Sequence, residues 1–178
     1  MTCIVGLQHA CGVTIGGDAA AVEGDRIAAY STPKVFTVGP FLIGFCDSFR
    51  MGQLLAHRLT VPPQRHETDL EYLATTFVDA VRKLFIRHGF HRTNTDNEEI
   101  GGVFLLGYRG QLYAIDEDYH VGRYVSGYEA LGVGADFALG SLFSTIGAPQ
   151  ARVNQALHAS TFHSTSVCPP FTVITQNS

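Results

Sequence analysis

The sequence has no tryptophan, only two methionines and little charge: 16% of its 178 residues are Asp, Glu, Lys or Arg. It contains no run of Lys and Arg, and its formal net charge is −4, so the composition does not favour binding to a nucleic-acid backbone. No apolar run approaches the roughly 20 residues of a membrane-spanning helix, and no basic region of a targeting signal precedes the first apolar residues. We therefore expect no nucleic-acid partner, no membrane segment and a cytoplasmic location.

Cysteine is scarce, and histidine forms no metal-binding pattern. The four cysteines, at positions 3, 11, 46 and 168, include no C-x-x-C pair. Without a secretion signal, free thiols are expected rather than disulfides. His88 and His91 lie three residues apart, but in a polar turn region without an H-E-x-x-H motif or a cysteine partner. We expect no metal and no cofactor.

Hydrophobic residues make up 46% of the sequence, and they recur with the periods of strands and helices. Its length favours a single domain over residues 1–178. Alternating β-forming residues between turn signals predict strands over 2–9, 12–17, 26–30, 34–38, 41–46, 102–108, 111–116, 120–125, 129–133 and 171–175. Helical periodicity predicts helices over 48–59, 69–88, 135–146 and 149–162, and residues 92–99 are expected to form a polar loop.

Pairs of helices therefore alternate with groups of antiparallel strands. This order predicts an α+β protein, a four-layer αββα sandwich in which two sheets pack face to face and helices cover each outer face. The apolar stripe of the 69–88 helix is expected to face the core. In the 135–146 helix, the periodicity rests on Phe137, Leu139, Leu142, Phe143 and Ile146.

The start of the chain carries the clearest chemical pattern. A small residue after the initiator permits removal of Met1, which would make Thr2 the N-terminus. A free N-terminal Thr supplies a nucleophilic hydroxyl and, with an α-amine pKa of about 7.7–8.0, a general base. Asp18 ends a Gly-Gly-Asp run, and Lys34 opens a strand. At neighbouring strand ends, Lys34 would favour the alkoxide and Asp18 would hold Lys34.

A glycine-containing segment lies between an expected strand and an expected helix, which is where a cofactor-binding loop would be found. Gly132 and Gly134 could belong to a dinucleotide-binding loop, but Phe137 stands where a third glycine would be needed. No parallel βαβ unit surrounds the segment. A glycine pair that permits close approach of the backbone is the better account.

Taken together, these features resemble the proteasome β-subunit family of N-terminal nucleophile hydrolases, over nearly the whole chain. The resemblance rests on the T-x-I-V-G-like start at Thr2, on Gly-Gly-Asp at 16–18, on Lys34, on the strand 41–45, on the hairpin strand 101–108 and on the segment 131–139. Within the family, the small bacterial proteasome homologue is the most similar, judged by the segments 34–36, 48–55 and 107–112.

The resemblance implies a threonine-type endopeptidase that cleaves peptide bonds. Thr2 would be the nucleophile, its amine the base, and Lys34 the group that lowers the pKa of the nucleophile. Asp18 would orient Lys34, and the N–H of Gly44 would donate to the oxyanion.

The resemblance also implies substrates and partners. Small or apolar residues near the site, Ala21, Pro33 and Leu42, would favour apolar substrate residues before the scissile bond. The substrates would be peptides or unfolded proteins, cleaved inside a homo-oligomer of two stacked rings of seven subunits each. An ATP-dependent unfoldase is a possible partner that the sequence does not identify.

Two departures from the family pattern leave alternatives open. Val133 stands where the family usually has a Ser that hydrogen-bonds around the Thr amine. The segment 164–170 lacks the family's late Asp, for which His163 or Ser164 could substitute. A catalytically weak or silent ring-forming subunit, and a hydrolase of small amides with the same fold, therefore remain alternatives to the peptidase.

Overall fold

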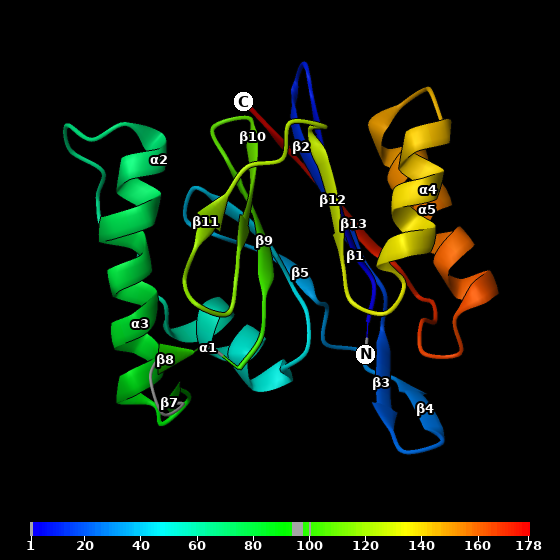
Figure 1. The fold of residues 1–178 in the computed structure, drawn as a ribbon, viewed down its shortest axis with the longest axis horizontal. Helices are drawn as coiled ribbons and strands as arrows, with labels where there is room; N and C mark the ends of the chain where they lie inside the picture. The colour runs from blue at the N-terminus through cyan, green and yellow to red at the C-terminus, as the bar shows by residue number, and fades with distance from the viewer. Residues whose placement is uncertain (1, 94–97, 100) are drawn as a thin grey trace.

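The computed structural model describes residues 2–93, 98–99 and 101–178. Its elements form four layers, seen edge-on in Figure 1 in the order helices, sheet, sheet, helices. The predicted α+β fold, a four-layer αββα sandwich, is confirmed. Among the described residues, no helix has the length and apolar character needed to cross a membrane.

Two antiparallel sheets form the inner layers. One has the order β12-β1-β2-β13, with strands Tyr128–Leu131, Ile4–His9, Gly12–Gly17 and Thr172–Asn177. The other has the order β11-β10-β9-β6-β5, with strands Val121–Gly122, Gln111–Ile115, Phe104–Tyr108, Phe41–Phe45 and Val35–Val38. The register of β1 with β2 places Ile4 opposite Gly17, so the start of β1 and the end of β2 lie together.

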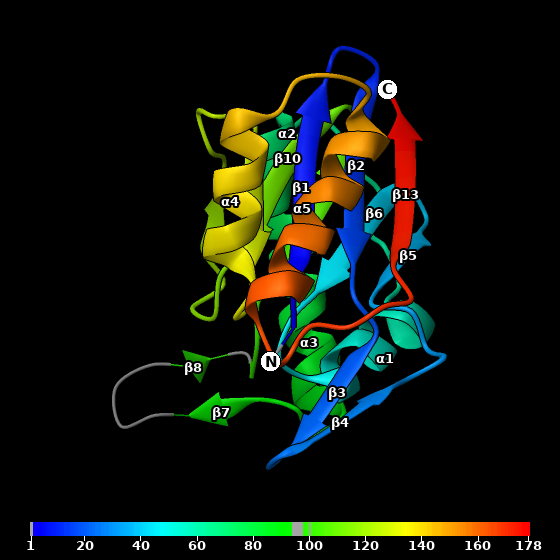
Figure 2. The same ribbon diagram turned by 90° about the vertical axis from the view of Figure 1, so that its right-hand side faces the viewer.

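Helices cover both outer faces. α1 (Phe49–Arg58), α2 (Asp69–Tyr72), the π-helical turn η1 (Leu73–Phe77) and α3 (Val78–Arg87) lie on the five-stranded sheet. α4 (Ala135–Ser144) and α5 (Pro149–His163) lie on the four-stranded sheet, in front of β1 and β2 in Figure 2. Residues typical of helix N-termini stand where three of these helices begin. At α1, the Ser48 hydroxyl accepts a hydrogen bond from the Met51 N–H, and at α2, Thr68 and Glu71 form a capping box. Pro149 occupies the first turn of α5.

Each of the three boundaries between layers has its own apolar core. Phe41 of β6 packs its ring 4.7 Å from that of Phe77 beneath the first helix layer. Ile4 and Ile15 are completely buried between the two sheets. On the other side, Gly16 lets α5 lie close to β2, because a Cβ at Gly16 would stand 2.5 Å from the Val153 side chain. Burial of each large side chain contributes about 1.5–3 kcal/mol, so these cores hold the layers in register.

A hairpin projects from the end of the sandwich at which β1 begins (Figure 1). It consists of β3 (Ala20–Glu23) and β4 (Arg26–Ala29), which pair only with each other among the described strands. A second short pair, β7 (Arg92–Thr93) and β8 (Glu98–Glu99), projects near the end of α3 (Figure 2). The N-terminal end of the sandwich is therefore flanked by extensions of the chain.

Several predicted boundaries differ from the structure. The sequence analysis missed β3, whose Gly- and Asp-containing turn concealed a four-residue strand. The expected polar loop at 92–99 contains the β7–β8 pair, and its residues 94–97 lie outside the described residues. The expected strand 120–125 is only the two-residue β11, and η1 interrupts the long helix predicted over 69–88.

The 135–146 helix also differs, in both length and orientation. α4 ends at Ser144, so Ile146 lies beyond it and is 99% exposed. Phe143 is 83% exposed and Phe137 40% exposed, whereas Ala138 and Leu142 form the buried face. The apolar periodicity therefore covers an outer surface as well as the core-facing side, which periodicity alone cannot distinguish.

Candidate active site

Three polar side chains are buried together at the N-terminal end of the sandwich. Thr2 precedes β1, Asp18 follows β2 and Lys34 precedes β5, and each is 2% exposed. The Lys34 ammonium donates a hydrogen bond to the Thr2 hydroxyl and another, of 2.8 Å, to Asp18 Oδ1. The structure thus brings together the three residues that the sequence analysis selected for catalysis.

The Asp18 carboxylate is fully hydrogen-bonded. Its Oδ1 accepts from the Cys3 N–H at 3.0 Å as well as from Lys34, and its Oδ2 accepts from the N–H groups of Ala20 at 2.9 Å and Cys168 at 3.4 Å. A buried carboxylate is tolerated only when it is paired and hydrogen-bonded in this way. The arrangement fixes the position of the Lys34 ammonium.

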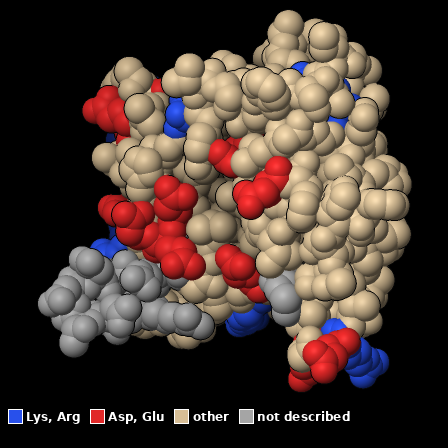
Figure 3. All heavy atoms as spheres, turned by 45° about the vertical axis from the view of Figure 1, so that its right-hand side comes forward, with Lys and Arg blue, Asp and Glu red and all other residues tan. Residues whose placement is uncertain are grey.

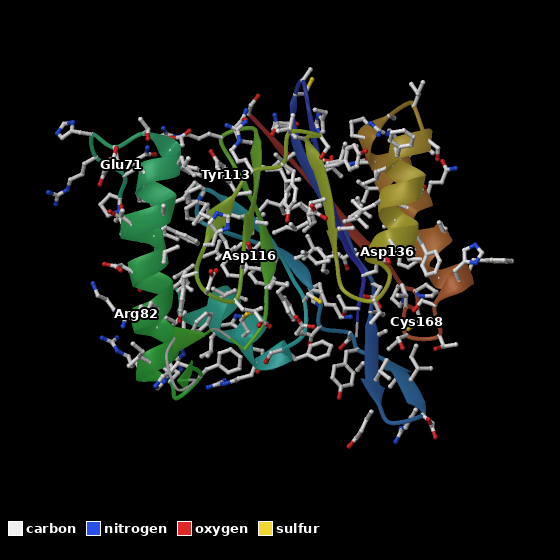
Figure 4. The ribbon with its side chains drawn as sticks, viewed as in Figure 1. Glu71, Arg82, Tyr113, Asp116, Asp136 and Cys168 are labelled. Atoms are coloured by element: carbon white, nitrogen blue, oxygen red, sulfur yellow. The ribbon has the colours of Figure 1, made fainter. Side chains whose placement is uncertain are left out.

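Cys168 lies in the segment 164–170, which the sequence analysis connected with the site only through a missing Asp and not through Cys168 itself. It lies between α5 and β13, on the outer side of the sandwich in Figure 4. Its carbonyl accepts the Ala19 N–H at 3.0 Å, so the backbone of residue 168 contacts both Asp18 and its neighbour. His163, suggested as a replacement for the missing acidic residue, instead packs against Phe137 and Phe162 with ring centroids 5.1 Å apart.

A glycine loop surrounds the Thr2 carbonyl group. Gly134 donates its N–H to the Thr2 oxygen at 3.4 Å. A Cβ at Gly132 would stand 2.2 Å from that oxygen, and the residue has φ +88°, a region that side chains disfavour. The backbone of this loop therefore makes its predicted close approach to Thr2. Val133, which lies between the two glycines, is 48% exposed.

Ser160 of α5 is a buried polar residue that the sequence analysis missed. Its hydroxyl lies 2.8 Å from the Gly134 carbonyl oxygen and accepts the Cys3 S–H at 3.3 Å. The sequence feature that could have identified Ser160 is a hydroxyl residue on a helix face otherwise formed by Val153, Ala156 and Leu157. Ser160 thus connects the glycine loop to the residue next to Thr2.

Three thiols lie close to this cluster, and all four cysteines are free. Burial raises the pKa of Cys3 to about 11, and burial together with the Asp47 charge raises that of Cys46 to about 12. Burial and the Asp18 charge also raise the pKa of Cys168. Because the thiolate is the reactive form of cysteine, these side chains are poor nucleophiles at neutral pH. The hydroxyl of Thr2, next to the Lys34 ammonium, is the better placed nucleophile.

Gly44 lies within β6, where it pairs with Val35 of β5 and Leu105 of β9. The Cys46 N–H bonds to the Val103 carbonyl at 2.9 Å on the β9 side. Because N–H directions alternate along an antiparallel strand, the Gly44 N–H also points to β9. It is used by the sheet and is not free to donate to an oxyanion. Past β6, the Asp47 N–H donates to the Cys46 sulfur and not to a sheet carbonyl of the described residues.

The three residues expected to bind substrate lie in different surroundings. Ala21 lines a hollow of about 450 Å³ between the β3–β4 hairpin and the turn after β6. Pro33 lines a smaller apolar hollow of about 100 Å³. Leu42 is completely buried between the sheets, where a substrate would not reach it. Within residues 2–93, 98–99 and 101–178, no group of three or more His, Cys, Asp or Glu is placed to hold a metal ion.

Comparisons with known proteins bear on the fold. No family model and no curated protein matches the sequence. Among solved structures, Thiobacillus denitrificans BPH in complex with epoxomicin is similar with a TM-score of 0.80 at 14% identity, over 98% of both chains. Eukaryotic HslV from Trypanosoma brucei gives a TM-score of 0.69 at 17% identity, over 99% of both chains. Anbu from Yersinia bercovieri gives 0.67 at 19% identity, over 98% of this chain and 81% of that chain.

These similarities establish that the chain has the fold of the proteasome-like N-terminal nucleophile hydrolases. At such low identities they show the fold alone. The residue-level case therefore rests on the buried cluster of Thr2, Asp18 and Lys34.

The first prediction concerns the charge pair. Asp18→Asn should lower the free energy of unfolding by about 3 kcal/mol, because it leaves the buried Lys34 charge without its partner. Urea denaturation followed by circular dichroism at pH 7 measures this. The control is Asp116→Asn, which removes a 45% exposed carboxylate that faces His120 and should cost less than about 0.5 kcal/mol. Equal losses in the two variants would contradict the assigned role of Asp18.

The second prediction concerns the thiols. Because Cys3 and Cys46 are buried and their pKa values are raised, iodoacetamide should modify exposed Cys11 much faster than Cys3 or Cys46 in the folded protein at pH 8. Peptide mass spectrometry over a time course gives the rates, and the urea-unfolded chain provides the control in which all four thiols react. Similar rates at Cys3 and Cys11 before unfolding would refute the assigned environment of Cys3.

Proposed function

We propose that this chain, once Met1 is removed, is a threonine-type endopeptidase subunit that cleaves peptide bonds through Thr2. The observation that carries the proposal is the Lys34 ammonium, buried between the Thr2 hydroxyl and the Asp18 carboxylate. The similarity to BPH, HslV and Anbu supports a hydrolase of this fold.

The arrangement suits activation of a hydroxyl. The Lys34 charge stabilises the alkoxide form of Thr2, and Asp18 with its N–H donors holds that charge in place. The α-amine exposed by removal of Met1 takes the hydroxyl proton, directly or through water. Thr2 Oγ then attacks the carbonyl carbon of the peptide bond. The nitrogen of the cleaved bond takes the proton from the α-amine and leaves as the new amino end of the product. Water then hydrolyses the ester formed on Thr2.

We further propose that the subunit acts in a homo-oligomer of two stacked rings, with seven subunits in each. The outer face of α4 and α5 supports this. The charged residues in 135–163 are Asp136 and Arg152, and the Arg152 guanidinium is bonded to the Leu142 carbonyl oxygen at 2.7 Å. Figure 3 shows this side of the molecule as a broad surface nearly free of Lys, Arg, Asp and Glu. Exposed aromatic and aliphatic side chains on such a surface are typical of an interface.

A silent ring-forming subunit is the second candidate. Val133 favours it, because a half-exposed valine next to Thr2 supplies no hydrogen bond to the free amine. The two candidates share the fold and the assembly but differ in the reactivity of Thr2.

The third prediction tests that reactivity. A peptidyl epoxyketone forms a ring with the hydroxyl and the free amine of one N-terminal Thr, so the purified protein should lack the mass of Met1 and gain one adduct per chain. Intact-mass spectrometry measures both. Thr2→Ala should gain no adduct and lose peptidase activity by at least about 1,000-fold, since it removes the nucleophile.

Two outcomes would contradict the peptidase proposal. Peptide hydrolysis that persists in Thr2→Ala would exclude Thr2 as the nucleophile. Loss of Met1 without an adduct, and without peptidase activity, would favour the silent subunit.

The fourth prediction tests the assembly. Replacing Phe143 and Ile146 together by Ser should reduce the molar mass found by size-exclusion chromatography with light scattering, because it removes two exposed apolar side chains from the α4–α5 face. The matched control replaces Leu70 and Ile86, exposed by 49% and 43% on the opposite helix layer, and should leave the mass unchanged. Identical masses for wild type and the Phe143 and Ile146 variant would refute this face as an interface.

A further inference from the structure

A hollow of about 450 Å³ lies beside the buried cluster, between the β3–β4 hairpin and the turn that follows β6. Its lining includes Ala21, Glu23, Arg26, Tyr30, Asp47 and Phe49. Binding sites for small ligands usually have volumes of about 300–1,000 Å³, so an extended side chain fits here. The hollow plays no part in the chemistry assigned to Thr2, Asp18 and Lys34.

The hollow is adjacent to the reacting atoms through Phe49. The centroid of the Phe49 ring lies 5.6 Å from Lys34 Nζ, and Lys34 in turn contacts Thr2 Oγ1. The Tyr30 ring lies 4.9 Å from the Phe49 ring, and the Tyr30 N–H bonds to the Ala19 carbonyl next to Asp18. A side chain bound in the hollow therefore belongs to a peptide close to Thr2.

A second, apolar hollow of about 100 Å³ shares Phe49 with the first. Its floor is filled by the Phe45 ring, which lies so close to α1 that a Cβ at Gly52 would stand 2.2 Å from it. Only a small group fits in this space. The larger hollow is therefore the one that can accept a long substrate side chain.

The charged residues that line the larger hollow are one cation, Arg26, and two carboxylates, Glu23 and Asp47. Glu23 and Arg26 are directly opposite each other in the β3–β4 pair, so these two opposite charges are neighbours on the hairpin. Asp47 is exposed, and its Oδ1 accepts only the weak Cys46 S–H donor at 3.3 Å among the described residues. Figure 3 shows acidic and basic side chains together at the end of the molecule formed by this hairpin. An arriving cation would find its partner in Asp47.

We propose that this hollow binds an arginine or lysine side chain of the peptide substrate, with the cationic group at the Asp47 carboxylate. The aliphatic stem lies against the Tyr30 and Phe49 rings, whose faces also attract a guanidinium group. An acidic side chain meets the like charge of Asp47 and is disfavoured. This inference rests on the proposed peptidase function, and it replaces the apolar preference that Ala21, Pro33 and Leu42 had implied.

The experiment compares fluorogenic peptides that differ only in the residue before the scissile bond, arginine or its uncharged isostere citrulline. In the wild type, kcat/KM should be about tenfold higher for arginine, as expected for one charge-assisted contact. In Asp47→Asn this ratio should fall to within about twofold of unity. Asp25→Asn makes the same change of charge at the tip of the hairpin, outside the lining, and should keep the wild-type ratio.

Binding to the Thr2→Ala protein provides a second measurement that does not depend on turnover. Fluorescence anisotropy with labelled peptides should show tighter binding of the arginine peptide, and the preference should disappear when Asp47→Asn is added. A binding preference without hydrolysis in the wild type upholds the hollow and refutes the peptidase. Hydrolysis of both peptides at equal rates upholds the peptidase and refutes the binding of a cationic side chain in the hollow. Equal or undetectable binding of both peptides overturns the inference.

Discussion

The site depends on one electrostatic constraint: a lysine ammonium is buried with a single carboxylate as its charged partner. Removing both groups from water costs several kcal/mol per ion, and their attraction offsets this only when the remaining hydrogen-bonding capacity is used. The N–H groups of residues 3, 20 and 168 provide that capacity at Asp18. The positions of β1, β2, β5 and the segment before β13 are therefore coupled through one carboxylate.

The sandwich supplies the rigidity that such a pair requires. The β1–β2 register leads to Asp18 opposite Cys3, next to Thr2, and the inter-sheet core holds β5, with Lys34 at its start, against them. From the opposite side, α5 presents Ser160 to the glycine loop that closes on the Thr2 carbonyl. The lysine charge is thus directed at one hydroxyl, because every element that carries a member of the cluster is packed on at least one core.

Sequence alone was sufficient for the layers and for the three central residues. Alternating and helical periodicities are strong over β1, β2, α1 and α3, and Thr2, Asp18 and Lys34 stand at recognisable strand ends. The contacts made by backbone groups could not be predicted from the sequence. The role of Cys168 depends on its N–H and carbonyl, which every residue has, and the direction of the Gly44 N–H depends on its place in the ladder. The exposure of Phe143 could not be predicted for another reason: an exposed apolar side chain on a helix can follow the same periodicity as one that packs in a core.

The contact between Cys168 and Asp18 joins the buried cluster to a segment that lies 150 residues away in the sequence. Residue 168 leads into β13, and β13 pairs with β2, the strand that leads into Asp18. A nascent chain that lacks this segment has an incomplete set of donors around the carboxylate and an unfilled sheet edge beside it. The ordering of the Thr2, Asp18 and Lys34 cluster is thereby linked to the presence of residue 168 and β13.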